Sequence, residues 1–136
     1  YDIYKKIINN SLKQVEQFTI ELGEDREKKM PQPKKSNYWR KREKSDGEIN
    51  FSSSSDNIIN LVRALTKPYP GATCSFEGQD IIIWSIEKGK NQNKNIEPGK
   101  VLSVNKRSIE VKTGDFSVIL VDHEFSTIPK LNQYIK

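Results

Sequence analysis

The chain has 136 residues, of which 34% are hydrophobic, and a formal net charge of +5. This length holds one domain, or one small domain with part of another. No apolar run approaches the length of a membrane-spanning helix and no signal peptide opens the sequence, so no membrane partner is expected. The single cysteine, Cys74, excludes an internal disulfide and favours a reducing, cytoplasmic location. A secreted protein that buries one thiol is the alternative.

The first 22 residues have apolar side chains at helical spacing: Tyr4, Ile7, Ile8, Leu12, Val15, Phe18 and Leu22. This pattern predicts an amphipathic helix that ends at Gly23. No residue precedes the pattern to act as its N-cap. We therefore expect the chain to be the C-terminal part of a longer protein. The apolar face of the helix would rest on the part of that protein that precedes it.

Residues 23–48 are charged, contain two prolines and are predicted to be a linker. The basic charge of the chain is concentrated there, because residues 28–44 hold 8 basic residues and 1 acidic residue. Residues 71–136 hold 9 basic and 8 acidic residues and are nearly neutral. A partner that carries negative charge is therefore expected at the linker.

Two aromatic residues stand inside the basic stretch, and the candidate binding residues are Tyr38, Trp39, Arg40, Lys41 and Arg42. Guanidinium groups bind phosphates through two hydrogen bonds, and aromatic rings stack on nucleobases. The tract therefore predicts a nucleotide-binding segment. A solvated linker with scattered surface charge is the alternative, and it explains the other lysines of the stretch better.

A second helix is expected to begin in the serine run, where Ser53 and Asp56 have the spacing of a capping box. Its apolar positions are Ile58, Ile59, Leu61, Val62 and Leu65. Pro68 ends this helix, because proline lacks an N–H and its ring clashes with the preceding turn. Residues 68–72, Pro-Tyr-Pro-Gly-Ala, then form a corner into an extended region.

Five short strands are predicted after this corner, at residues 73–77, 80–87, 100–104, 108–112 and 116–122. The fold class is therefore α+β: two helices and a linker, followed by a small five-stranded antiparallel β-barrel or curled sheet, similar to an OB-fold. Open edge strands in such a sheet would pair with another chain and give a homodimer. Residues 127–136 fit either one helical turn or a frayed end.

Several motifs follow one another at separations that match a known family: residues 31–32 (Pro-Gln), 38–42 (Tyr-Trp-Arg-Lys-Arg), 46–51 (Asp-Gly-Glu-Ile-Asn-Phe), 63–72 (Arg-Ala-Leu-Thr-Lys-Pro-Tyr-Pro-Gly-Ala), 98–101 (Pro-Gly-Lys-Val) and 113–115 (Thr-Gly-Asp). In this order they resemble the formyltransferases, which include methionyl-tRNA formyltransferases and sugar-nucleotide N-formyltransferases. At 46–51 that family shows D-G-x-I-D-W, from which Asn50 and Phe51 depart. The resemblance assigns residues 1–70 to the end of the catalytic domain and residues 71–136 to a C-terminal barrel domain.

The resemblance implies transfer of a formyl group from N10-formyltetrahydrofolate to an amine. The family's catalytic asparagine, histidine and aspartate and its cofactor loop would lie upstream of Tyr1, so this chain alone is expected to be inactive. Lys41 and Arg42 match positions that approach the diphosphate of a nucleotide. Arg63 and Tyr69 match positions near the seam between the two domains. A salt bridge of Arg63 and simple packing of Tyr69 at the corner are the alternatives.

The acceptor implied by the resemblance is a nucleotide-linked aminosugar or methionyl-tRNA. A barrel that binds tRNA should be basic, because neutralisation of phosphates dominates the affinity. The near-neutral residues 71–136 therefore favour the aminosugar. A non-catalytic barrel that binds single-stranded nucleic acid is a third hypothesis, but Phe76, Trp84 and Phe116 are expected in the core. The spacing of His, Cys and Asp predicts no metal site, and His123 is expected at the surface.

Overall fold

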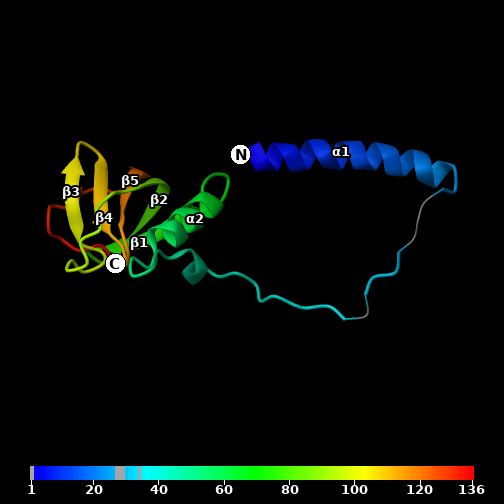
Figure 1. Cartoon of the computed structure of the whole chain (residues 1–136). Coiled ribbons are helices and arrows are strands. Elements are labelled where there is room, and N and C mark those ends of the chain that lie inside the picture. The colour runs from blue at the N-terminus through cyan, green and yellow to red at the C-terminus, as the bar shows by residue number, and fades with distance from the viewer. Residues whose placement is uncertain (1, 27–29, 34) are drawn as a thin grey trace. The chain divides into compact units, whose positions relative to one another are not determined.

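The computed structural model describes residues 2–26, 30–33 and 35–136. The chain divides into two units, Tyr1–Lys41 and Arg42–Lys136, and Figure 1 shows the order of their elements. The predicted domain division at residue 70 remains a prediction. In the structure, the helix that precedes this position packs on a strand that follows it, within the second unit.

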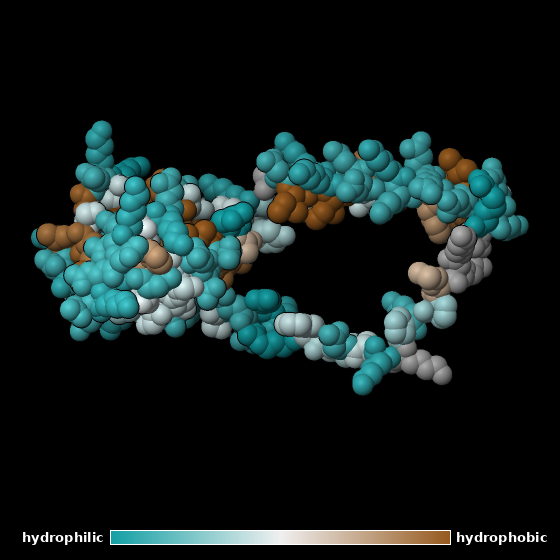
Figure 2. All heavy atoms as spheres, in the orientation of Figure 1, coloured by the Kyte–Doolittle hydropathy of each residue, from teal (hydrophilic) through white to brown (hydrophobic). Residues whose placement is uncertain are grey.

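The first unit contains one long helix, α1 (Asp2–Gly23), which confirms the helix predicted over this region. None of its residues is buried within the unit. Its large apolar side chains range from 44% exposed at Ile8 to 75% exposed at Ile3, and Figure 2 shows hydrophobic atoms at the surface of the helix. The periodic apolar face is therefore present, and no described residue of its own unit covers it.

The second unit begins with a 3₁₀ helix, η1 (Lys44–Gly47), and a longer helix, α2 (Ser55–Leu65). The N-cap of α2 is Ser54, whose hydroxyl accepts a hydrogen bond from the Asn57 N–H at 3.3 Å. The predicted N-cap, Ser53, is therefore wrong by one residue. Four consecutive serines offer equivalent hydroxyl groups, so the sequence does not distinguish among them. Ile58 and Val62 on the inner face of α2 are buried, and the helix packs mainly on the second strand.

Five antiparallel strands form one sheet in the order β1-β2-β5-β4-β3, which confirms the predicted fold class. Their bounds are β1 (Ala72–Phe76), β2 (Gln79–Lys88), β3 (Val101–Asn105), β4 (Ser108–Lys112) and β5 (Ser117–His123). Inward side chains make the core, and the fully buried ones include Ile83, Ile109, Val111, Val118 and Leu120. The period-2 alternation of these residues explains why sequence reasoning placed the strands within one or two residues.

The sheet itself is not closed, and β1 and β3 are its edges. Residues 132–136 lie along both edges. The Val101 N–H donates to the Gln133 carbonyl at 2.8 Å, and the Lys136 N–H donates to the Ser75 carbonyl at 2.8 Å. Ile135, between these contacts, is only 2% exposed. Neither the helical turn nor the frayed end predicted for this segment is observed, because its backbone groups find partners on two edges that are distant in sequence.

Candidate functional site

The basic aromatic tract is an extended segment without helix or strand. Tyr38 is 93% exposed and Trp39 is 84% exposed. Arg40, Lys41 and Arg42 are also exposed, and the Arg40 guanidinium donates to the Lys41 carbonyl at 3.2 Å. The first four residues of the tract belong to the first unit and Arg42 begins the second. The structure thus leaves the predicted binding side chains open to a ligand, but it does not gather them into a pocket.

The segment after the tract is attached firmly to the sheet. Asp46 accepts a hydrogen bond from the Glu43 N–H at 2.7 Å, and the Lys44 ammonium lies 2.5 Å from the Asp80 carboxylate. The hydrogen bond and charge of Asp80 raise the pKa of Lys44. Beyond η1, the Ile49 N–H donates to the Thr73 carbonyl at 2.7 Å. These contacts fix the C-terminal end of the tract relative to β1.

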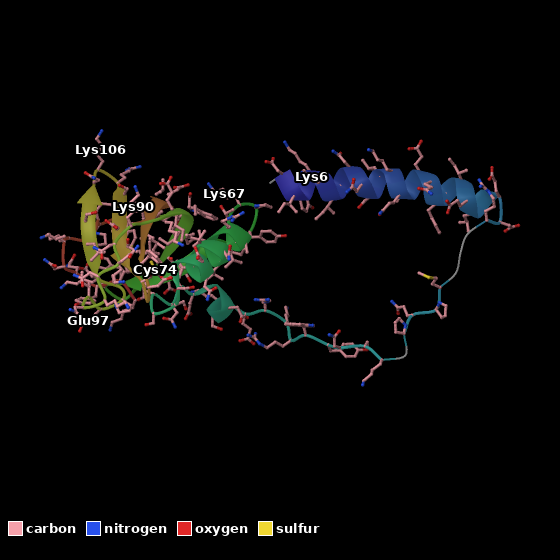
Figure 3. The ribbon with its side chains drawn as sticks, in the orientation of Figure 1. Lys6, Lys67, Cys74, Lys90, Glu97 and Lys106 are labelled. Atoms are coloured by element: carbon pink, nitrogen blue, oxygen red, sulfur yellow. The ribbon has the colours of Figure 1, made fainter. Side chains whose placement is uncertain are left out.

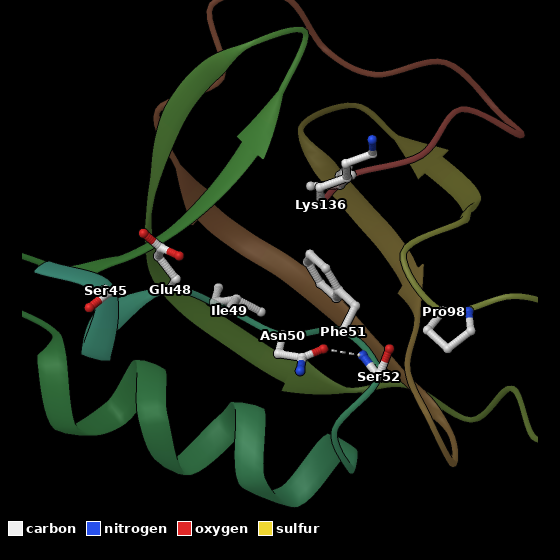
Figure 4. A pocket seen from close by; sticks show the side chains of 9 residues that line it. Ser45, Glu48, Ile49, Asn50, Phe51, Ser52, Pro98 and Lys136 are labelled. Carbon is white, nitrogen blue, oxygen red and sulfur yellow. Dashed lines mark hydrogen bonds between the residues drawn. The ribbon is translucent and has the colours of Figure 1, made fainter.

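A cavity of about 480 Å³ lies beside this segment (Figure 4). Its apolar lining comes from the buried residues Ile49, Phe51 and Ile135. Its polar lining comes from exposed residues that include Ser45, Glu48, Asn50 and Lys136. The Asn50 side-chain oxygen accepts a hydrogen bond from the Ser52 N–H at 2.9 Å. Sequence reasoning missed this cavity, because its walls come from segments more than 80 residues apart and no local pattern joins them.

The turn between β4 and β5, predicted only as a tight turn, holds a buried polar cluster. Lys112 is 1% exposed, and its ammonium donates to the carbonyls of Thr113 (2.9 Å), Asp115 (3.0 Å) and Phe116 (2.9 Å). All three of its donors are therefore used within one turn. These three hydrogen bonds offset the high free-energy cost of burying the charged ammonium group.

Asp115 joins the same turn to the start of α2. Its carboxylate accepts hydrogen bonds from the N–H groups of Ser55 and Phe116, both at 2.7 Å, and from the Thr113 hydroxyl at 3.0 Å. Burial by itself raises the pKa of Asp115, but these hydrogen bonds outweigh it and lower the pKa to about 2. A Cβ on Gly114 would lie 2.3 Å from the Ser52 carbonyl oxygen, so only glycine fits this approach. The cluster is a structural anchor with no spare group for chemistry.

The two predicted seam residues both lie at the surface of the second unit. Arg63 is exposed in the last turn of α2, and it forms no salt bridge with any residue that the structure describes. Tyr69 is 55% exposed in the corner that follows. Gly71 turns that corner with φ of +90°, and a Cβ there would lie 2.4 Å from the Ile82 side chain. The close approach of Gly71 to β2 thus fixes the corner on the sheet, and the side chains of Arg63 and Tyr69 remain exposed.

His123 and Cys74 are not arranged for catalysis. The His123 Nε2 lies 2.5 Å from the Arg107 carbonyl, and its Nδ1 accepts from the Phe125 N–H at 3.4 Å. Because a carbonyl only accepts, the contact with Arg107 requires a proton on Nε2, and the ring is thereby tied to the backbone. Cys74, labelled in Figure 3, is buried, and burial raises the pKa of its thiol to about 12. A thiol with this pKa is a poor nucleophile at neutral pH.

The described residues also contain no group of three or more His, Cys, Asp and Glu side chains that could hold a metal ion. No helix in the described part of the chain is long and apolar enough to cross a membrane. What the described residues do offer is a well-packed sheet, an exposed basic aromatic segment and an uncovered apolar helix. Exposed charged, aromatic and apolar surfaces of this kind are typical of binding and docking.

Comparison with known proteins identifies the class of this fold. The family described as "Formyl transferase, C-terminal domain" matches residues 41–133, which include all of the sheet. The chain therefore belongs to the formyl transferase family, as the motifs at residues 46–51 and 63–72 indicated.

Individual relatives cover the chain to different extents. The chain is 37% identical over 89 residues to the bifunctional polymyxin resistance protein ArnA of Wigglesworthia glossinidia brevipalpis, covering 60% of this chain and 13% of that protein. It is 29% identical over 123 residues to the methionyl-tRNA formyltransferase of Acetivibrio thermocellus, covering 90% of this chain and 37% of that protein. It thus spans well under half the length of these relatives.

A solved structure shows the same fold. The chain matches HypX from Aquifex aeolicus in complex with tetrahydrofolic acid with a TM-score of 0.57 and 19% sequence identity. The match covers 89% of this chain and 20% of HypX.

Proposed function

We propose that this chain is the C-terminal part of an N10-formyltetrahydrofolate-dependent N-formyltransferase that acts on a nucleotide-linked aminosugar. The observation that carries the proposal is the contrast between the exposed tract at residues 38–42 and the nearly neutral residues 71–136. A localised basic aromatic segment suits one nucleotide diphosphate. A long polyanion would instead require basic residues spread over a larger surface.

In this proposal the tract holds the nucleotide. Tyr38 and Trp39 offer uncovered rings for stacking on the base, and Lys41 and Arg42 offer charge to the diphosphate. Lys44 holds the segment that follows the tract on the sheet through its hydrogen bond to Asp80, and the Ile49 N–H adds a hydrogen bond to the Thr73 carbonyl. The sheet would therefore serve as a rigid base from which the tract approaches the substrate.

The remaining surfaces would dock the catalytic part of the enzyme. The apolar face of α1 offers seven large side chains, each at least 44% exposed, for burial against it. Arg63 and Tyr69 would lie at the seam. When bound by the rest of the enzyme, N10-formyltetrahydrofolate would supply the formyl group: the neutral sugar amine would bond to the formyl carbon, the bond from that carbon to N10 would break, and groups outside this chain would carry the amine proton to N10.

The lining of the cavity beside residues 45–52 does not fit the folate cofactor. N10-formyltetrahydrofolate ends in a glutamate with two carboxylates, whereas the cavity described above offers one cation, Lys136, and places Glu48 in the same lining. Like charges in one site repel. We therefore assign the cofactor to the part of the enzyme outside this chain and expect this chain alone to transfer no formyl group.

Methionyl-tRNA is the second candidate acceptor, supported by the similarity to a methionyl-tRNA formyltransferase over 90% of the chain. A non-catalytic module that binds single-stranded nucleic acid is a third candidate, for which the exposed rings of Tyr38 and Trp39 would be the stacking platform. The three candidates predict different ligands for the same tract, so one set of variants separates them.

The test uses the complete enzyme that contains this chain, carrying Lys41→Gln with Arg42→Gln. For a nucleotide-linked aminosugar we expect KM to rise at least about 10-fold with kcat little changed, since the loss of even one charge-assisted hydrogen bond costs about 1.5–3 kcal/mol. The matched control is Lys94→Gln with Lys106→Gln, which removes the same charge from exposed positions on the second unit. Loss of methionyl-tRNA formylation, or of RNA binding in a gel shift, with aminosugar kinetics unchanged would contradict the proposal.

A further inference from the structure

The cavity described above lies within the second unit, and backbone hydrogen bonds fix its walls. On one side, Ser75 and Lys136 exchange two backbone hydrogen bonds of 2.5 and 2.8 Å. On another side, next to Pro98, the Ile135 N–H donates to the Gly99 carbonyl at 2.9 Å. The cavity is therefore formed before any ligand arrives, and its volume of about 480 Å³ lies in the range of sites that bind small molecules.

The lining carries one exposed charge of each sign. Glu48 and Lys136 are both exposed, and neither forms a salt bridge with any residue that the structure describes. The charge of Glu48 helps to raise the pKa of Lys44, but the Lys44 ammonium is paired with the Asp80 carboxylate at 2.5 Å. Figure 4 shows the side chains of Glu48 and Lys136 at separate places around the cavity. A ligand that carries a cation and an anion some distance apart complements this arrangement.

The lining also offers neutral hydrogen-bonding groups around an apolar floor. The hydrogen bond from the Ser52 N–H orients the Asn50 amide and leaves both Nδ2 hydrogens without an acceptor among the described residues. The hydroxyl groups of Ser45 and Ser52 likewise make no hydrogen bond within the described part of the chain. Phe51, which is 4% exposed, forms the floor. Amide and hydroxyl groups placed around an apolar surface suit a ring that carries hydroxyl groups.

The chain itself keeps the cavity close to a residue of the basic tract. Arg42 begins the second unit and precedes Ser45 by three residues, which span at most about 11 Å even when fully extended. In a nucleotide-linked sugar, the ring is joined directly to the diphosphate. A diphosphate held at Arg42 therefore brings its sugar to the side of the molecule that Ser45 lines.

We propose that this cavity binds the sugar ring of a nucleotide-linked aminosugar and that Glu48 selects the ring by its protonated amine. This inference rests on the function proposed above, which places the nucleotide at the tract. The Glu48 carboxylate accepts a hydrogen bond from the ammonium group, and Lys136 contacts the phosphate next to the sugar. An N-acylated sugar binds more weakly, because its amide carries no charge for Glu48. The ammonium must lose a proton before it can attack, so Glu48 acts in recognition and not in the transfer.

The test measures ligand binding to the complete enzyme that contains this chain, by isothermal titration calorimetry and without a formyl donor. For both UDP and dTDP, the probes are the diphosphate alone, a linked aminodeoxysugar and the N-acetylated form of that sugar. We expect the enzyme to bind the aminosugar at least about 10-fold more tightly than the N-acetylated form, as one charge-assisted hydrogen bond provides. Glu48→Gln should abolish this preference and leave the affinity for the diphosphate alone unchanged.

Two further variants separate the cavity from the rest of the surface. Glu87→Gln removes the same charge from an exposed position on β2 outside the lining, and it should keep the full preference for the amine. Ser52→Trp fills the cavity from an exposed position, and it should weaken the binding of both sugars to the level of the diphosphate alone. Unchanged affinity for the two sugars in the Ser52 variant would show that the ring lies elsewhere.

The outcomes distinguish this inference from the function on which it rests. If the Glu48 variant keeps the preference for the amine while Lys41→Gln with Arg42→Gln weakens binding of the diphosphate, the cavity assignment is overturned and the role of the tract stands. If none of the UDP and dTDP probes binds the complete enzyme, both are overturned. Loss of the preference in the Glu48 variant, with the Glu87 control unchanged, supports the cavity as the sugar site.

Discussion

The two long helices of this chain have similar apolar periodicity and opposite environments. On α2, Ile58 and Val62 are 2% and 1% exposed, because the helix lies on the sheet. On α1, Ile8 is 44% exposed and Leu12 is 65% exposed. An amphipathic pattern thus specifies a helix and the face that will be buried, but it does not specify which surface covers that face. Within the second unit the sheet covers the apolar face of α2, whereas the described residues of the first unit do not cover that of α1.

The largest expected difference between the two units is in amide hydrogen exchange of the isolated chain. Residues of β4 and β5 should exchange only through global unfolding, whereas α1 should open at almost no cost, a contrast of about 5 kcal/mol. A helix without tertiary contacts is marginally stable in water. Hydrogen exchange followed by mass spectrometry on peptides from residues 2–23 and 109–120 measures this difference in protection. Equal protection in the two regions would show that α1 has found a covering surface.

Truncation of matched leucines should sharpen the same contrast. Leu120→Ala in the core is expected to lower the free energy of unfolding by about 2–5 kcal/mol, because it removes packed methyl groups and leaves a cavity. Leu12→Ala on α1 should change it by less than about 0.5 kcal/mol. Urea unfolding followed by Trp84 fluorescence measures both. A comparable loss in the Leu12 variant would contradict the independence of the two units.

Substitution of the buried lysine tests whether the turn after β4 is an anchor. Lys112→Met keeps the length of the side chain but removes its hydrogen bonds to three carbonyls, of which Phe116 keeps one from the Thr113 N–H, and should cost about 3 kcal/mol. Lys106→Met at the exposed tip of the β3–β4 hairpin (Figure 3) is the matched control and should be nearly neutral. Thermal unfolding of both variants gives the comparison. If the Lys112 variant is as stable as the control, the ammonium does not contribute to the fold.

The smallest expected effect is the pH dependence that comes from Asp115. Its folded pKa of about 2 lies below the value of about 3.9 for an unfolded aspartate, so its contribution is complete above about pH 4 and is lost as the pH falls toward 2. Asp115→Asn should lower stability at neutral pH by about 1 kcal/mol, similar to loss of a helix cap. It should also flatten the stability curve between pH 4 and 2. Parallel pH curves for the two proteins would exclude this role.

Local pattern was enough to predict α2 and the five strands of the second unit, but not η1, which falls in the predicted linker. The strands end within one or two residues of their predicted bounds, because alternation of apolar residues and turn residues such as Gly78 are local signals. The N-cap of α2 was misplaced by one residue, because Ser53 and Ser54 are chemically identical. The tail was mispredicted, because residues 132–136 carry no periodicity of their own and pair with strands that begin 30 and 60 residues earlier.

The candidate site was predictable only in part. Composition identified the tract at residues 38–42, and its exposure in the structure keeps it available to a ligand. The cavity next to Phe51 could not be predicted, since its walls come from segments distant in sequence. The cluster around Lys112 and Asp115 depends on the folded turn and on its contact with Ser55 of α2. A charged residue in a strand pattern is normally expected to face solvent, and the three carbonyls that bury Lys112 are visible only once the turn is folded.

The sequence by itself determined the helices, the strands, the family and the location of the positive charge, because each depends on neighbouring residues and short motifs. Tertiary structure alone decided that residues 132–136 pair with both edges of the sheet. It further decided that Asp115 accepts a hydrogen bond from the N–H of Ser55, the first residue of α2, 60 residues away. It also decided that the face of α1 stays uncovered within its own unit. The physical reason is that hydrogen bonds and burial between distant segments depend on the path of the whole chain, and no local pattern encodes that path.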